Sequence, residues 1–365
     1  MTTQKRSITD LVRPAIANRM AYVPATGAAK KPDRVIHMDM NESPYGPGPR
    51  TRATLADFVQ TNRYPDFAQS ALRAALADYT GVPAGQIVCG AGLDDVFVAV
   101  AMALIDPGDE IIISEPTFGV YRPLFEMHGG TVVNAPLTAD FAIQPEIVLA
   151  AVTERTKLII ICSPNNPTGN LFPFADVERI CAEAPCLVAI DEAYVEFSGQ
   201  SHISLMDTYD NVMILRTMSK WAGLAGMRVG YGLIPEALAP AILAATPPFH
   251  NVSLISSEAA IASLEEQAFL LDQVAQICHD RDILISGINA LPGLAALPSV
   301  TNFILIATDR ADAKPIVDAM AGHGVLVRAY GDPVLRGYLR VSVGTPAENA
   351  EFLRVLDQAY KETAA

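Results

Sequence analysis

Short apolar runs alternate with amphipathic helical stretches through the first two thirds of the chain. The apolar runs are rich in Ile, Val and Leu, which predicts buried strands, and they cover residues 86–90, 110–114, 131–137, 157–163, 187–194, 212–217 and 228–234. Helical patterns fill several of the gaps, at residues 68–79, 93–104, 118–128 and 174–183. Buried strands that alternate with helices usually form a parallel sheet with both faces covered. The pattern therefore predicts an α/β fold, a three-layer sandwich around a mostly parallel central sheet.

The pattern changes after about residue 247. A long stretch at residues 253–291 predicts one or two long helices, and it is followed by short strand-like runs that alternate with helical stretches. The strand-like runs cover residues 301–307, 325–330 and 338–343, and a terminal helix is predicted from residue 347. This grouping predicts a smaller α+β domain.

A chain of 365 residues exceeds what one core normally serves, so we expect more than one domain. Residues 1–45 are predicted to form an N-terminal arm and part of the small domain. Residues 46–250 form the large domain, and residues 251–365 form the small C-terminal domain. The first 34 residues carry Pro14, Pro24, Gly27 and Pro32 and show little periodicity, which predicts an arm that contacts either a partner or the chain's own second lobe.

Composition and charge exclude several functional classes. The net charge of -14 and the pI near 4.8 disfavour nucleic acid and anionic membranes as partners. No apolar run is long enough to span a bilayer, and the basic N-terminal residues are not followed by an apolar stretch, so a cytoplasmic protein is expected. The five cysteines lack a C-x-x-C pair and the six histidines lack ligand spacing. No disulfide framework and no metal site are predicted.

Lys220 stands where the predicted strand 212–217 runs into a glycine-rich loop. Glycine lets the backbone turn tightly and approach a ligand closely. An amine in an apolar setting can lose its proton because desolvation disfavours the charged form. A neutral amine can then attack a carbonyl and form a Schiff base. A solvated surface lysine is the alternative, but the residues on both sides of Lys220 favour the reactive amine.

Other polar residues also follow predicted strands, where ligand sites of open α/β sheets lie. Asp191 interrupts an apolar run, and a carboxylate there is costly unless a cation such as a protonated pyridine nitrogen pairs with it. Tyr194 can donate to a phenolate-type oxygen. Asn166 can donate to a ligand oxygen, although the Asn-Pro-Thr-Gly sequence around it is also typical of a turn.

Anion-binding candidates lie in both halves of the chain. Residues 89–95 join a strand to a helix and can form either a phosphate site or an ordinary helix cap. A dinucleotide fingerprint fails there because Asp95 stands at its third glycine position. Arg228 can neutralise a phosphate. Arg340 and Arg328 each interrupt a strand-like run; either can bind an anion or face outward, and anion binding is favoured only for Arg340.

Together these candidates form the set that pyridoxal 5′-phosphate (PLP) requires. The set comprises a Schiff-base lysine, a phosphate cup, an aspartate for the ring nitrogen, an amide and a phenol for the ring oxygen, and arginines for anions. Further motif blocks occur along the chain, at residues 41–47, 62–65, 116–118, 163–169, 191–197, 217–231 and 339–345. These motifs resemble those of the fold-type I PLP-dependent aminotransferases, most closely the histidinol-phosphate aminotransferase branch. The resemblance spans nearly the whole chain in the family's order.

The resemblance implies a catalytic set of Lys220, Asp191 and Tyr194. Lys220 would form the Schiff base with PLP and move a proton between the substrate and the cofactor. Asp191 would pair with the ring nitrogen, and Asn166 and Tyr194 with the ring hydroxyl oxygen. The residues implied to hold or lie near the cofactor phosphate are Gly92, Leu93, Asp94, Thr217, Ser219 and Arg228.

The remaining implied roles concern the ring face, the partner subunit and the substrate. Phe118 would stack on the cofactor ring. Tyr64 would reach the cofactor phosphate of a neighbouring subunit, which implies a homodimer with shared active sites. Arg340 would bind the carboxylate or phosphate of the substrate. Arg328, Tyr22 and Asn166 would complete that substrate pocket.

The implied activity is transfer of an amino group from L-histidinol phosphate to the 2-oxo acid 2-oxoglutarate. The chain departs from the family pattern in Asn41-Glu42-Ser43-Pro44, where Asn-Glu-Asn-Pro is usual, in the cup residues 92–95, and in Trp221, where alanine is usual. Such changes bear on the substrate more than on the cofactor. An aromatic or other amino-acid aminotransferase of the same branch is therefore the alternative. A decarboxylase resembling threonine-phosphate decarboxylase ranks behind both.

Overall fold

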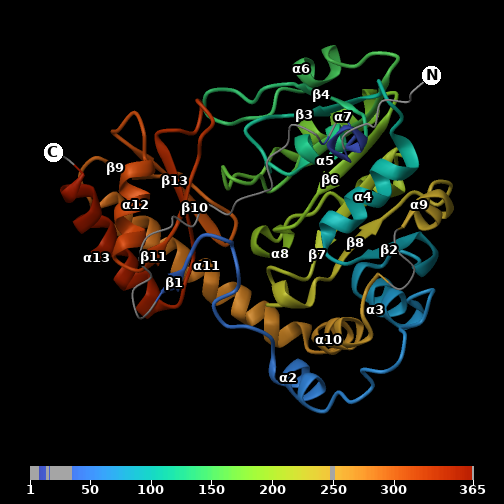
Figure 1. Ribbon diagram of the computed structural model, residues 1–365, viewed down its shortest axis with the longest axis horizontal. Coiled ribbons are helices and arrows are strands. Elements are labelled where there is room, and N and C mark those ends of the chain that lie inside the picture. Colours follow the sequence, from blue (N-terminus) through green and yellow to red (C-terminus); the bar gives the residue numbers. More distant parts are fainter. Residues whose placement is uncertain (1–7, 14–15, 17–34, 247–250, 364–365) are drawn as a thin grey trace.

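The structure is a computed structural model that describes residues 8–13, 16, 35–246 and 251–363 (Figure 1). Within this part of the chain, the largest sheet has seven strands in the order β2-β8-β7-β6-β5-β3-β4. β8 runs antiparallel to both of its neighbours, and the other neighbouring pairs are parallel. The strands are β2 (Ile87–Gly90), β3 (Glu110–Ile113), β4 (Thr131–Asn134), β5 (Thr156–Cys162), β6 (Leu187–Asp191), β7 (Val212–Thr217) and β8 (Gly230–Leu233).

Helices cover both faces of this sheet, because alternate residues of each buried strand point to opposite sides. In β5, Ile159 and Ile161 pack toward α3, α7 and α10, whereas Leu158 and Ile160 pack toward α4, α5 and α9. The predicted three-layer sandwich is therefore confirmed. The helices around it are α2 (Pro49–Ala56), α3 (Ser70–Thr80), α4 (Leu93–Leu104), α5 (Tyr121–Met127), α6 (Pro145–Ala150), α7 (Phe174–Glu183), α8 (Val195–Ser198), α9 (Ala239–Ala245) and α10 (Leu254–Glu265).

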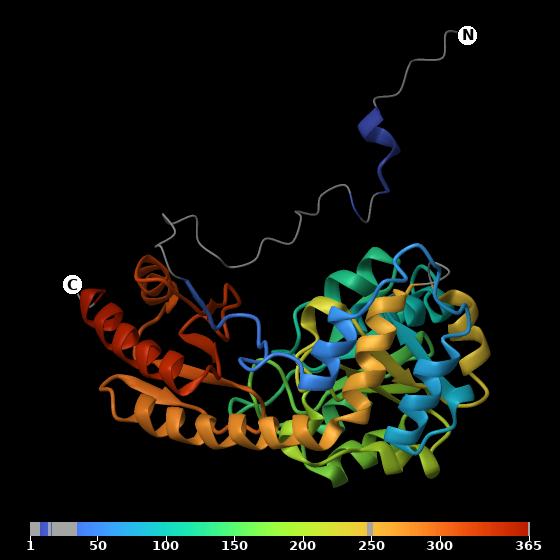
Figure 2. The same cartoon turned by 90° about the horizontal axis from the view of Figure 1, so that it is seen from below.

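A second, antiparallel sheet lies beside the first and has the order β12-β13-β10-β9. It packs with α12, α13 and the end of α11 around a separate core, and β1 pairs with β11 next to it. Figures 1 and 2 show α11 running from the large sheet to the small one. The elements are β1 (Ile36–His37), β9 (Leu294–Ala296), β10 (Phe303–Thr308), β11 (Val325–Leu326), β12 (Arg328–Ala329), β13 (Tyr338–Ser342), α11 (Gln267–Asn289), α12 (Lys314–Gly322) and α13 (Pro346–Glu362).

Several predicted boundaries were wrong in instructive ways. The strand predicted at residues 187–194 ends at Asp191, because the Asp191 carboxylate accepts a hydrogen bond from the backbone N–H of Ala193 at 2.9 Å and turns the chain. The strand predicted at residues 325–330 is divided at Val327 into β11 and β12, which join different sheets. The long helical stretch is two helices, α10 and α11. The domain boundaries at residues 45 and 250 stay a prediction.

No helix among the described residues is both long and apolar enough to cross a bilayer.

Candidate active site

The carboxyl ends of three neighbouring parallel strands bring Asn166, Asp191 and Lys220 to one edge of the large sheet. β5 pairs with β6 and β6 with β7, with Cys162 opposite Asp191 and Asp191 opposite Leu215. The polar residues that follow these strands therefore converge, as expected for the ligand-binding edge of an α/β sheet.

Asp191 is buried at the end of β6 and is held by two donors. The hydroxyl of Tyr121 donates to its Oδ2 at 2.5 Å, and the backbone N–H of Ala193 donates to its Oδ1 at 2.9 Å. Burial raises the pKa of Asp191 to about 6, and the Tyr121 hydrogen bond opposes this rise. The carboxylate is thus ionised at neutral pH, and none of the described side chains brings a cation into contact with it, which is the state in which it would attract a cationic ligand group.

Tyr194 lies at the start of α8 with only 4% of its surface exposed. The side-chain amide of Asn166 donates to its hydroxyl oxygen at 3.1 Å, and the amide of Asn41 donates to the same oxygen at 2.9 Å. The ring packs edge-on against Phe303 of β10, at 5.0 Å between centroids. Tyr194 is therefore held from both sheets.

Lys220 follows β7 and reaches across the site to the segment after β1. Its Nζ donates to the backbone carbonyl of Met40 at 2.9 Å. Burial, followed by the charge of Arg340, lowers the pKa of Lys220 to about 8. A substantial fraction of the amine is consequently neutral near pH 8, the state that a nucleophilic lysine requires.

Arg340 lies on β13 of the small sheet and contacts Asn166, which follows β5 of the large sheet. Its Nη1 donates to Asn166 Oδ1 at 2.7 Å, and its Nη2 donates to the backbone carbonyl of Asp39 at 2.6 Å. The guanidinium lies over the ring of Phe303, and its buried Nε has no hydrogen-bond partner among the described residues. A buried cation that contacts no carboxylate of the described residues is well suited to bind an anion.

The loop between β2 and α4 is the segment in which the sequence offered either a phosphate site or an ordinary helix cap. Gly92 caps α4 with a φ of 88°, a left-handed conformation that favours glycine. A Cβ at Gly92 would collide with the guanidinium of Arg228, so glycine also permits that arginine to lie against the loop. Arg228 Nη2 lies 3.3 Å from Asp94 Oδ2. Since a carboxylate repels phosphate, the helix N-terminus at Leu93 and the arginine are the groups suited to an anion.

The remaining predicted residues differ in how closely they approach this site. Thr217 ends β7 and Ser219 lies in the loop that follows; both are buried, and Thr217 Oγ1 accepts from the backbone N–H of Ser219 at 3.1 Å. Phe118 packs edge-on against Tyr121 at 5.4 Å between centroids. Arg328 lies directly opposite Arg340 in the β12–β13 ladder.

Tyr64 lies in the segment between α2 and α3 with 85% of its surface exposed. Tyr22 lies outside the described residues.

Sequence reasoning missed Tyr121 and Asn41. Tyr121 lies in a helical pattern, where an aromatic residue is normally a core residue, so no sequence signal marked it. Asn41 stood in a motif block, and asparagine is among the residues that tolerate a left-handed backbone. In the structure Asn41 adopts such a left-handed conformation, with a φ of 53°.

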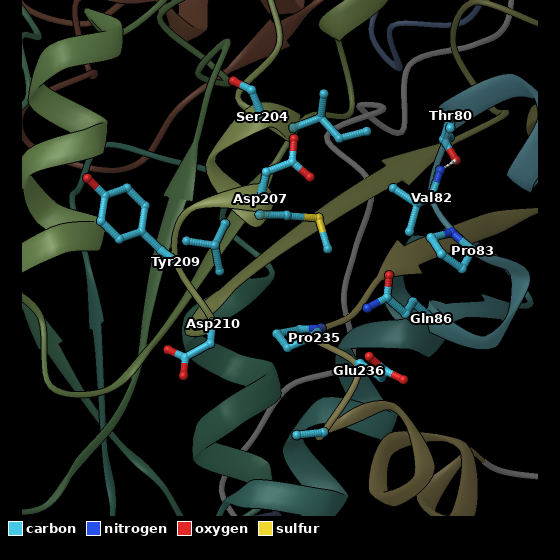
Figure 3. Close-up of a pocket in the computed structure, with 15 residues that line it drawn as sticks. Thr80, Val82, Pro83, Gln86, Ser204, Asp207, Tyr209, Asp210, Pro235 and Glu236 are labelled. Carbon is cyan, nitrogen blue, oxygen red and sulfur yellow. Dashed lines mark hydrogen bonds between the residues drawn. The ribbon is translucent and has the colours of Figure 1, made fainter.

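A separate cavity lies at the opposite edge of the sheet, where β7 begins rather than ends (Figure 3). Its volume is about 870 Å³, and Asp207, Asp210 and Glu236 line it together with apolar residues such as Pro83 and Pro235. None of the described residues that the sequence predicted to carry chemistry lines this cavity. The candidate site is therefore the edge at Lys220.

Comparisons with known proteins agree with this arrangement. The family model described as aminotransferase class I and II matches residues 33–356. A histidinol-phosphate aminotransferase of Roseiflexus castenholzii is 39% identical over 96% of this chain and 99% of its own length. A histidinol-phosphate aminotransferase from Dehalococcoides mccartyi is 38% identical over 90% of this chain and 91% of its own length.

Solved structures give the same result. A histidinol-phosphate aminotransferase from Sinorhizobium meliloti in complex with pyridoxal-5′-phosphate has a TM-score of 0.89 and 27% identity, over 97% of this chain and 98% of that one. An aspartate aminotransferase of Thermus thermophilus shares the fold, with a TM-score of 0.80 and 24% identity. The match covers 89% of this chain and 92% of that one.

Proposed function

The chain belongs to the class I and II aminotransferase family and is a PLP-dependent aminotransferase, and we propose that its reaction transfers the amino group of L-histidinol phosphate to 2-oxoglutarate. The observation that carries the substrate proposal is the likeness, over nearly the full chain, to relatives named for that reaction. The position of Arg340 supports it, because both proposed substrates are anionic.

The residues of the site fit PLP. Asp191 is an ionised, buried carboxylate that contacts no cation in the described part of the chain, which suits a protonated ring nitrogen. Arg228 and the N-terminus of α4 suit the phosphate. We propose that Leu93 and Asp94 contribute backbone N–H groups there, and that Gly92, Thr217 and Ser219 shape the loops around it. Phe118 is proposed to contact the ring face.

When bound, PLP supplies an electron-withdrawing ring that acidifies the hydrogen on the carbon bearing the substrate amino group. Lys220 is proposed to bind the cofactor and, at Nζ, to accept and return that proton. Its depressed pKa of about 8 suits this task, because a base is most effective when its pKa lies near the working pH. The Met40 carbonyl orients Nζ, and the ionised carboxylate of Asp191 would stabilise positive charge on the ring nitrogen of the bound cofactor.

Substrate recognition is assigned to the two opposed arginines. Arg340 is held by Asn166 and by the backbone of Asp39, so its remaining donor edge is oriented before an anion arrives. Arg328 occupies the facing position on β12, and directly opposed residues of an antiparallel pair lie on the same face of the sheet. We propose that Arg340 binds one anionic group of the substrate, with Arg328 and Tyr22 shaping the rest of the pocket.

The larger organisation is also part of the proposal. The exposure of Tyr64 supports a homodimer in which this residue reaches the cofactor phosphate of the neighbouring subunit. The division into residues 1–45, 46–250 and 251–365 and a cytoplasmic location stay predictions.

Steady-state kinetics with a panel of amino donors tests the proposed reaction. We expect the highest kcat/KM for L-histidinol phosphate with 2-oxoglutarate as acceptor. A higher kcat/KM for phenylalanine would replace the proposal with an aromatic aminotransferase. Carbon dioxide release without 2-oxoglutarate would replace it with a decarboxylase.

A lysine variant tests the cofactor site separately from the substrate. Lys220→Ala should abolish turnover and the visible absorbance of the bound cofactor. Lys361→Ala, at a lysine with 71% of its side chain exposed, should preserve both and serves as the control.

A further inference from the structure

The hydrogen bonds at the Tyr194 hydroxyl leave one bonding capacity unused. A phenolic oxygen can accept through its lone pairs and donate one proton. Asn41 Nδ2 and Asn166 Nδ2 both donate to this oxygen, at 2.9 Å and 3.1 Å. Two N–H donors occupy the acceptor side of the hydroxyl. Its proton must therefore point away from both amides.

Asn41 is held tightly enough to act as a fixed donor. Only 2% of its surface is exposed, and its φ of 53° is left-handed, which costs a non-glycine residue about 1 kcal/mol. Its backbone N–H donates to Ser342 Oγ at 2.8 Å, and its carbonyl accepts from Asn302 Nδ2 at 3.0 Å. The Ser342 hydroxyl donates in turn to Asn41 Oδ1 at 3.2 Å, which leaves Nδ2 of the amide to face Tyr194.

The two residues before Asn41 contact the same site through their backbones. The carbonyl of Asp39 accepts from Arg340 at 2.6 Å, and the carbonyl of Met40 accepts from Lys220 at 2.9 Å. The left-handed turn at Asn41 directs the chain so that these carbonyls and the Asn41 amide meet three different functional side chains. The segment 39–41 is thus anchored by the small sheet while it contacts residues of the large one.

We propose that Asn41 is a positioning residue that turns the Tyr194 proton outward, toward the oxygen of the bound ligand. This inference rests on the proposed function, in which Tyr194 donates to the ring oxygen of PLP. Asn166 alone would leave one lone pair of the hydroxyl open, and the proton could then take up other orientations. With both amides in place, donation away from them is the favoured arrangement.

Electrostatics at Tyr194 agrees with this geometry. Burial raises the pKa of Tyr194, whereas the charge of Arg340 and the Asn41 hydrogen bond lower it. The lowering contributions strengthen the hydroxyl as a donor, because a more acidic O–H donates a stronger hydrogen bond.

Two substitutions at this position separate the amide from the backbone turn. Asn41→Gly keeps the left-handed conformation at no steric cost and removes only the side chain. Asn41→Asp keeps the oxygen that accepts from Ser342 but replaces the donor with an acceptor, which would draw the Tyr194 proton toward itself. Tyr194→Phe sets the limit in which no proton is donated.

The measurements are the pH midpoint of the absorbance of the bound cofactor and the rate at which cofactor dissociates on dilution. One lost hydrogen bond predicts roughly a 3- to 10-fold faster dissociation for Asn41→Gly. The pH midpoint and the dissociation rate of Asn41→Asp should both be closer to those of Tyr194→Phe than the values of Asn41→Gly are. Gln69→Gly removes a buried left-handed side chain outside the site, at a φ of 54°, and should match the wild type.

The outcomes distinguish this inference from the proposed function. If the wild type binds PLP and transaminates while both Asn41 variants keep its midpoint and dissociation rate, the role of Asn41 is refuted and the enzyme assignment stands. If the wild type shows no cofactor absorbance that depends on Lys220, the proposed function itself fails. Circular dichroism checks folding, and Asn41→Asp decides the question if Asn41→Gly does not fold.

Discussion

The hydrogen bond from Tyr121 to Asp191 gives the most quantitative prediction. The hydroxyl lies 2.5 Å from Asp191 Oδ2, and both side chains are buried. Tyr121→Phe removes the hydroxyl and keeps the ring that packs against Phe97 and Phe118. The carboxylate then loses its side-chain donor, so its ionised form is less stable and its pKa rises.

The size of the effect follows from the strength of a hydrogen bond to a charged group. Such a bond contributes about 1.5–3 kcal/mol, which corresponds to roughly 1–2 pKa units. Starting from a pKa of about 6, Asp191 in the variant should titrate near neutral pH or above. At pH 7 its ionised fraction would fall roughly 2- to 10-fold. If only the carboxylate pairs with a protonated ring nitrogen, cofactor affinity should fall by the same factor.

The assay measures the dissociation constant of pyridoxamine 5′-phosphate, a probe that cannot bond covalently to Lys220. Quenching of Trp221, the single tryptophan of the chain, reports binding between pH 5 and 9. We expect affinity to weaken as pH falls through the pKa of Asp191, with the midpoint shifted upward in Tyr121→Phe. Tyr360→Phe is the matched control, because that hydroxyl donates to Asp309 at 2.7 Å on a different part of the surface.

An unchanged midpoint in Tyr121→Phe, with the control also unchanged, would refute the reasoning. It would mean that the backbone N–H of Ala193 alone sets the ionisation of Asp191.

Three further predictions concern stability and substrate binding. Burial raises the pKa of Glu196 to about 7 from 4.5, so the folded state holds a proton that the unfolded state releases. The free energy of unfolding should therefore fall by up to about 3 kcal/mol as pH rises from 4.5 to 7. In urea unfolding, Glu196→Gln should show a weaker pH dependence than the wild type. Arg340→Ala should raise KM for anionic substrates at least about tenfold, with a smaller effect on cofactor retention, and an unchanged KM would move the anion site elsewhere. Gly223 has a φ of 66°, and a Cβ there would collide with the backbone of Gly46. Gly223→Ala should therefore destabilise the folded protein by about 2 kcal/mol or more, measured by thermal unfolding. A Cβ at Gly226 meets nothing within 4 Å, so Gly226→Ala is the control and should not destabilise the protein comparably.

Most strands of the large sheet could be predicted because burial on both faces makes their residues largely apolar. β5 and β7 are examples, since nearly every residue of each is buried. The boundaries failed where a side chain or a tertiary neighbour redirected the backbone. Asp191 ends β6 by bonding to Ala193, and β11 separates from β12 because its partner is β1, from the other end of the chain.

Some residues of the candidate site could be predicted from the sequence, and others could not. Lys220, Asp191 and Asn166 could be found because each follows a buried strand, and parallel strands end at a common edge. Asn41 and Tyr121 could not be assigned their contacts, since these depend on which segments meet. Tyr121 and Asp191 are 70 residues apart, and Asn41 and Tyr194 are 153 apart.

By itself, then, the sequence determined the layered sheet, the strand that delivers Lys220, and the family whose motifs surround it. These are local properties, because hydrophobic period and glycine placement act over a few residues. Only the tertiary structure decided that Arg340 of the small sheet bonds to Asn166, 174 residues away, and that the turn at Asn41 lies against Tyr194. Those contacts arise from packing between two separate cores, and no local pattern records how such cores meet.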